Sequence, residues 1–125
     1  MDKDAINNLT ESIIGMAMKV HRTLGPGFVE KIYEKALACE FECNNVNYER
    51  QFRINVIYEG VDVGEQRVDF IIESEVILEL KSVSEIQRIH EAQLLSYLKA
   101  ANKKVGLILN FANKSLEIKR MVNKL

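Results

Sequence analysis

Several features that would narrow the function of this chain are scarce or missing. The 125 residues contain no Trp, a single Pro and two Cys. No apolar run approaches the roughly 18 residues that a membrane span needs, so we expect no membrane association. The N-terminal segment MDKDAINNLTES is polar and acidic, which does not fit a secretion signal. These absences predict one folded domain over residues 1–125, located in the cytoplasm.

The two cysteines suggest neither a disulfide framework nor a metal centre. Cys39 and Cys43 stand at helical spacing, which suits a disulfide poorly, and no other Cys completes a metal-binding set. We interpret them as free thiols in a reducing compartment.

The charge is nearly balanced overall but unevenly distributed. The formal net charge of −1 argues against a protein that coats nucleic acid by electrostatics alone. Residues 99–125 carry seven Lys or Arg and one Glu, a charge of +6, so the remainder carries −7. This basic C-terminal quarter is either a surface that contacts phosphates or an ordinary solvated face.

Hydrophobic periodicity predicts an α/β domain with the element order ααβββαββ. The first helix follows an apparent capping box at Asn8 and Glu11 and ends at Gly25-Pro26-Gly27. The run VGLILNF indicates a strand that is buried on both faces. We expect a second helix at 28–44 and a third at 86–101, and strands at 52–58, 67–72, 76–81, 105–111 and 115–122.

The expected strand VILELK, residues 76–81, ends in an acid and a base, where burial makes charge costly. Side chains alternate along a strand, so Glu79 and Lys81 share a face. A hairpin that turns at Ser74 brings Asp69 directly opposite Glu79, and two carboxylates at that range repel each other. A proton or a cation must therefore lie between them.

Oxygen ligands favour a divalent cation, most commonly Mg²⁺, between the two acids. Lys81 would then lie beside the ion, where an ammonium can orient water or stabilise charge on a phosphate. Spacing alone also allows a plain ion pair between Glu79 and Lys81, with Asp69 as a solvated charge. A register shift of one residue would separate the two acids.

The same residues resemble a known catalytic signature. Asp69, followed after nine residues by Glu79-Leu80-Lys81, is similar to the D…ExK pattern of the PD-(D/E)XK nuclease superfamily. Val68 stands where the superfamily's name has Pro, a difference that removes no ligand.

Two further motifs extend this resemblance. Gly27, Glu30 and Tyr33 are similar to the motif that names the GxxExxY family, a branch of the same superfamily. Gln93 and Tyr97 resemble the QxxxY element that follows the active-site lysine in related nucleases.

The resemblance, which covers residues 9–112, implies a restriction-endonuclease-like core in which helices flank a mixed β-sheet. It implies hydrolysis of phosphodiester bonds in nucleic acid, with DNA the expected substrate. The implied Mg²⁺ (or Mn²⁺) ligands are Glu30, Asp69, Glu79 and the Leu80 carbonyl, with Lys81 as the catalytic ammonium and Gln93 and Tyr97 over the site.

A function of another class stays open. The chain could keep the nuclease fold as a non-catalytic module that binds nucleic acid or protein, or need a homodimer to complete its groove. The clustered acids favour the enzyme, because a scaffold has no physical reason to keep them.

Overall fold

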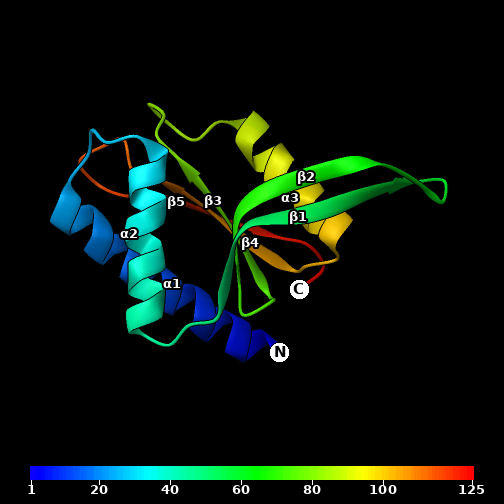
Figure 1. Ribbon diagram of the computed structural model, residues 1–125, viewed down its shortest axis with the longest axis horizontal. Coiled ribbons are helices and arrows are strands. Elements are labelled where there is room, and N and C mark those ends of the chain that lie inside the picture. The colour runs from blue at the N-terminus through cyan, green and yellow to red at the C-terminus, as the bar shows by residue number, and fades with distance from the viewer.

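A computed structural model describes all 125 residues and shows five strands and three helices (Figure 1). The observed order confirms the predicted α/β class and the arrangement ααβββαββ. The elements are α1 (Lys3–Leu24), α2 (Glu30–Cys43), β1 (Tyr48–Tyr58), β2 (Val61–Ile72), β3 (Val76–Lys81), α3 (Arg88–Ala101), β4 (Val105–Asn110) and β5 (Glu117–Val122).

The strands form one mixed sheet in the order β1-β2-β3-β4-β5. Only β3 and β4 are parallel, and α3 is the crossover that parallel neighbours require. All six residues of β4 are buried, as its continuous apolar run predicts.

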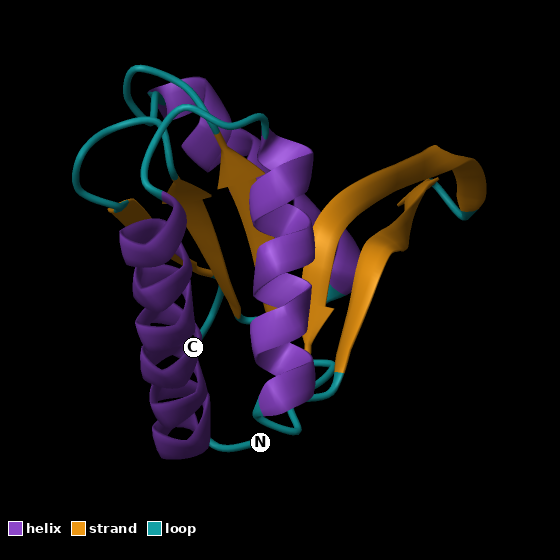
Figure 2. Ribbon diagram, turned by 60° about the vertical axis from the view of Figure 1, so that its left-hand side comes forward, coloured by secondary structure: helices purple, strands orange, loops and turns teal.

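Helices cover both faces of the sheet (Figure 2). On one face, Leu78 and Leu80 of β3 pack in a core shared with α1 and α2. On the other face, Ile77 packs in a second core with Leu94 and Leu98 of α3. Because side chains alternate along β3, the residues that follow Ile77 at even spacing also face α3.

A long β-hairpin projects from the sheet (Figure 1). β1 and β2 pair along their whole length, but β2 pairs with β3 only from Phe70 to Ile72. We call residues 53–67 the hairpin arm. Its outer part exposes large apolar side chains, including Tyr58 at 67% and Val61 at 60%.

Three predicted boundaries were wrong by more than about two residues. α1 begins at Lys3, because Asp2 caps it by accepting a hydrogen bond from the Ala5 N–H, and Asn8 lies inside the helix. β1 and β2 begin at residues 48 and 61, not 52 and 67. Most of the hairpin arm is exposed on both faces, so alternating hydrophobicity could not mark the start of β2.

Cys39 and Cys43 are exposed free thiols, as the sequence indicated. None of the three helices has the length and apolar character needed to cross a bilayer.

Gly106 of β4 allows α3 to approach the sheet closely. A Cβ atom there would lie 2.8 Å from Cδ1 of Leu94, which is fully buried. We expect Gly106→Ala to lower the free energy of unfolding by about 1–3 kcal/mol, because the core must shift to admit the methyl group. Urea denaturation measures this change.

Gly15→Ala is the matched control, since Gly15 is exposed on α1 and a Cβ there meets no atom within 4 Å. It should raise the free energy of unfolding by about 0.5–1 kcal/mol through reduced chain entropy. If Gly106→Ala also raises the free energy of unfolding, the proposed close packing of α3 is wrong.

Candidate functional site

Asp69 and Glu79 lie where β2 and β3 separate. The last ladder pair is Phe70 with Leu78, and the two acids come next on each strand. The Glu79 carboxylate accepts a hydrogen bond from the Asp69 N–H at 3.1 Å, and the Asp69 carboxylate accepts one from the Leu80 N–H at 2.7 Å. The predicted pairing of Asp69 with Glu79 is therefore confirmed.

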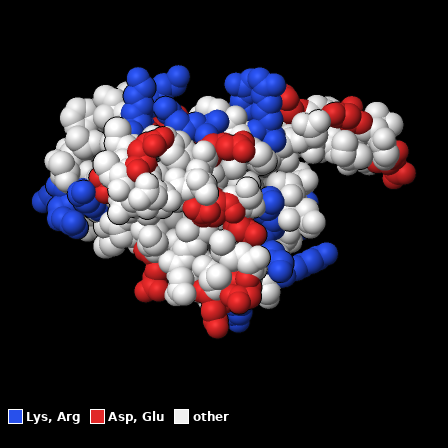
Figure 3. All heavy atoms as spheres, turned by 60° about the horizontal axis from the view of Figure 1, so that its bottom comes forward, with Lys and Arg blue, Asp and Glu red and all other residues white.

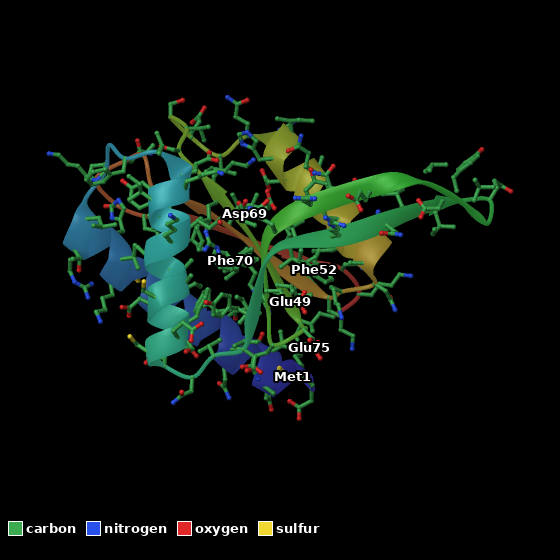
Figure 4. The ribbon with its side chains drawn as sticks, in the orientation of Figure 1. Met1, Glu49, Phe52, Asp69, Phe70 and Glu75 are labelled. Carbon is green, nitrogen blue, oxygen red and sulfur yellow. The ribbon has the colours of Figure 1, made fainter.

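The strand changes face at Asp69. Val68 packs in the core under α3, whereas Phe70 packs in the core with α1 and α2. Opposite this point on β1, Gln51 has a φ of 52°, a left-handed conformation that costs a non-glycine residue about 1–3 kcal/mol. Figure 4 shows Asp69 at the base of the hairpin, where the arm leaves the sheet.

Burial, and after it the charge of the nearby Asp69 carboxylate, raise the pKa of Glu79 to about 8, against the lowering effects of the hydrogen bond from the Asp69 N–H and of Lys81. Burial likewise raises the pKa of Asp69, while its hydrogen bond from Leu80 opposes the change. At neutral pH the metal-free pair therefore retains a proton, because two adjacent half-buried carboxylates cannot both ionise cheaply.

Lys81 is half-buried and forms no ion pair with Glu79 or any other acid. The alternative of a plain ion pair at the strand end, with a solvated Asp69, is therefore wrong. The N–H and C=O of a strand residue point to the same side. Because the Leu80 N–H donates to Asp69, the Leu80 carbonyl also faces the gap between the strands.

Tyr33 fixes the turn that precedes α2. Its hydroxyl donates to the Gly25 carbonyl at 2.6 Å and accepts from the Phe28 N–H at 3.2 Å. The ring is fully buried and stacks on Phe111 at 4.4 Å. Gly27, with a φ of 112°, supplies a conformation that side chains rarely adopt. Tyr33 is thus a core aromatic and does not contact Glu30 through a hydrogen bond.

Glu30 is the first residue of α2 and turns toward the end of β3. Its Oε1 accepts a hydrogen bond from the Ser82 N–H at 3.1 Å. Burial is the largest cause of the raised pKa of Asp69 and of Glu79. The negative charge of Glu30 is a smaller cause that raises both pKa values further. The third acid therefore approaches the pair from a different part of the chain.

The residues expected on α3 lie at different depths. Tyr97 is half-buried against the second core, and burial, followed by the charge of Glu79, raises its pKa. Gln93 is exposed one turn earlier and forms no hydrogen bond with the three acids. His90 caps α3 by accepting from the Gln87 N–H.

The sequence reasoning missed a supporting network around Glu34. This acid is 7% exposed and accepts two hydrogen bonds from the Arg50 guanidinium, at 2.7 and 3.1 Å. The Gln51 amide donates to Glu34 at 2.9 Å and reaches Asp69 at 3.5 Å. An acid four residues after Glu30, within an apolar helix stripe, was the available signal.

The donor chemistry of the three acids fits a hard divalent cation, since all of the candidate ligands are oxygen atoms. In this conformation, however, no group of three or more His, Cys, Asp or Glu side chains is arranged to hold a metal ion. Glu30 is exposed and is held by one hydrogen bond, from the Ser82 N–H.

Residues 7–121 match the protein family described as the PD-(D/E)XK nuclease superfamily. The match spans most of the chain, which therefore belongs to this superfamily. Its members are generally nucleases that depend on divalent metals. A comparison with curated proteins gave no match.

Two solved structures share the fold. The crystal structure of SSO0001 has a TM-score of 0.59 at 19% identity, covering 76% of this chain and 50% of that one. The chain thus spans about half the length of that protein. The structure of an alkaline exonuclease (LHK-Exo) from Laribacter hongkongensis has a TM-score of 0.57 at 10% identity, covering 99% and 73% of the two chains.

The raised pKa of Glu79 predicts how the metal-free protein responds to pH. The proton on Glu79 stabilises the folded state fully below the acid's usual pKa, and this contribution is lost as pH rises through about 8. Glu79→Gln cannot ionise and keeps an acceptor for the Asp69 N–H. We expect it to flatten the profile and, at pH 9, to stabilise the protein by at least about 1 kcal/mol.

Chemical denaturation in EDTA between pH 5 and pH 9 measures both effects. Glu49→Gln removes a carboxylate of equal charge from an exposed position without an ion pair, and its profile should follow that of the wild type. Parallel profiles for Glu79→Gln and the wild type would contradict the buried, protonated pair.

Proposed function

We propose that this chain is a divalent-metal-dependent nuclease of the GxxExxY branch, which hydrolyses phosphodiester bonds in nucleic acid, with DNA preferred over RNA. The observation that carries the proposal is the half-buried pair of Asp69 and Glu79 beside the unpaired Lys81. Such a pair costs stability, and perturbed carboxylates of this kind are typical of functional sites. We also propose that residues 1–125 are a single nuclease domain that acts in the cytoplasm.

The proposed metal ligands are Glu30, Asp69, Glu79 and the Leu80 carbonyl. When bound, Mg²⁺ or Mn²⁺ supplies Lewis-acid stabilisation of the phosphate and a more acidic water. The proposed ligands lie on α2, β2 and β3, so the site forms only when the chain is folded.

The proposed catalytic residues act from the face of the sheet that α3 covers. The Lys81 ammonium stabilises the negative charge that develops on the phosphate, and it is available because no acid neutralises it. Tyr97 is half-buried on α3, and we propose that it lies over the site. Gln93 is exposed on the same helix, where its amide can contact a phosphate oxygen. The preference for DNA rests on analogy of fold and site.

A second function is favoured by one observation. The hairpin arm exposes Ile57, Tyr58 and Val61 on either side of its turn, and exposed apolar side chains gathered in this way are typical of protein contacts. A binding module without turnover, or a homodimer that completes the groove, would use this arm.

Cleavage of single-stranded, duplex and branched DNA and RNA in Mg²⁺ or Mn²⁺ tests the activity. We expect Lys81→Ala to lower the cleavage rate at least about 100-fold, because one stabilising charge is lost from the transition state. Lys104→Ala, an exposed lysine at the other end of the sheet, should cleave like the wild type. Equal residual cleavage by the wild type and Lys81→Ala would indicate a contaminant and end the proposal.

Thermal unfolding with increasing Mg²⁺ or Mn²⁺ tests the metal site separately. A ligand present at 100 times its Kd stabilises the folded protein by about 2.7 kcal/mol, so the wild-type Tm should rise. Asp69→Asn and Glu79→Gln should remove this rise, because each replaces a proposed ligand with a neutral amide. Glu49→Gln should keep it. A wild-type response in both site variants would show that the cation binds elsewhere.

A further inference from the structure

A pocket without any hydrophobic residue lies beside the acids. It has a volume of about 470 Å³ and is lined by Lys31, Glu34, Lys35, Arg50, Gln51 and Arg67. We call it the cation pocket. Its lining brings together residues of α2, β1 and β2, so it exists only in the folded chain.

Three of the four cations in this pocket are uncompensated. Arg50 is paired with Glu34 at 2.7 Å, and this pair neutralises both charges. Lys31, Lys35 and Arg67 are exposed, form no ion pair and donate no side-chain hydrogen bond. Positive charges that line one concave wall create a potential that attracts an anion.

Two residues that line the cation pocket, Gln51 and Lys31, connect it to the candidate site. The Gln51 amide, part of the pocket lining, donates to Glu34 and reaches Asp69 at 3.5 Å. Lys31 also lines a second pocket of about 560 Å³, together with Glu30 and Ser82. An anion bound among these cations would therefore lie next to the acids.

Lys103 and Lys104 of the basic C-terminal quarter cannot take this role. β3 and β4 are parallel, so Lys81 pairs with Asn110 at one end of the sheet, and Val76 pairs with Val105 at the other. Lys103 and Lys104 directly precede Val105, so they lie at the end of the sheet opposite the acids. The tip of the hairpin arm carries Glu59 and Asp62, and Figure 3 shows acids there, which repel phosphate.

We propose that the cation pocket binds a phosphate group of the nucleic-acid strand, adjacent to the phosphodiester that is cleaved. This inference rests on the proposed nuclease function and names a contact of the same site. Arg67 offers a planar set of N–H donors that suits phosphate oxygens, and Lys31 and Lys35 add mobile ammonium groups. The bound group is either an internal phosphodiester or a terminal phosphate, which present the same oxygen atoms.

The double variant Lys35→Gln/Arg67→Gln tests the pocket, and Lys99→Gln/Lys104→Gln is the control with the same change of charge. All four residues are exposed and unpaired. Fluorescence anisotropy in EDTA measures the Kd of a labelled single-stranded oligonucleotide, without turnover, between 50 and 300 mM NaCl. Thermal unfolding checks that both variants fold like the wild type.

We expect the pocket variant to weaken binding at least tenfold at 100 mM NaCl. Its plot of log Kobs against log salt should become shallower by at least about 0.7, the value for one phosphate contact on a single strand. The control variant should keep the wild-type Kd and slope. Equal losses in both variants would show a long-range charge effect and overturn the pocket.

The remaining outcomes separate this inference from the proposed function. If the wild type cleaves and both variants bind like it, the nuclease stands and the pocket is wrong. If the wild type cleaves but binds no oligonucleotide in EDTA, the nuclease stands and the pocket is wrong; if it neither cleaves nor binds, both are wrong. Oligonucleotides with phosphorylated or hydroxyl ends then identify the bound group. If the pocket variant weakens binding only of the phosphorylated oligonucleotide, the group is a terminal phosphate. If it weakens binding of both oligonucleotides equally, the group is an internal phosphodiester.

Discussion

The structure depends on two side-chain carboxylates that replace backbone carbonyls as hydrogen-bond acceptors at the point where β2 and β3 separate. Beyond Phe70 and Leu78 the carboxylates of Asp69 and Glu79 accept the hydrogen bonds that a ladder would have supplied. The strands can therefore part without leaving buried N–H groups unpaired. The same bonds hold two acids at close range in a half-buried position, where a proton or a cation must offset their repulsion.

The surroundings of this pair supply both its rigidity and its third acid. The Tyr33 hydroxyl fixes the turn before α2 by donating a hydrogen bond to the Gly25 carbonyl. Glu30, at the start of α2, accepts a hydrogen bond from the Ser82 N–H just after β3. One turn further along α2, the buried Glu34 holds Gln51 in its left-handed conformation opposite Asp69. A strained backbone at this point is offset by hydrogen bonds, an arrangement typical of functional sites.

Local patterns predicted the elements wherever one face is buried. The bounds of β3 were predicted correctly, because its side chains alternate between two cores. The start of β2 was missed, since the hairpin arm has no buried face to produce a pattern. The start of α1 was missed because Asn8 resembles an N-cap residue, although Ile6, two residues earlier, is already buried in the helix. Glu34 was missed because periodicity does not reveal which helical acid is buried with a partner.

The sequence by itself determined that Asp69 faces Glu79, because a strand has a period of two and the turn near Ser74 sets the register. Only the tertiary structure decided which cations accompany these acids. The parallel pairing of β3 with β4 places Lys103 and Lys104 of the basic C-terminal quarter at the far end of the sheet, while α2 and β2 bring Lys31, Lys35 and Arg67 beside the site. Charges far apart in sequence carry no local period, so only long-range packing places them.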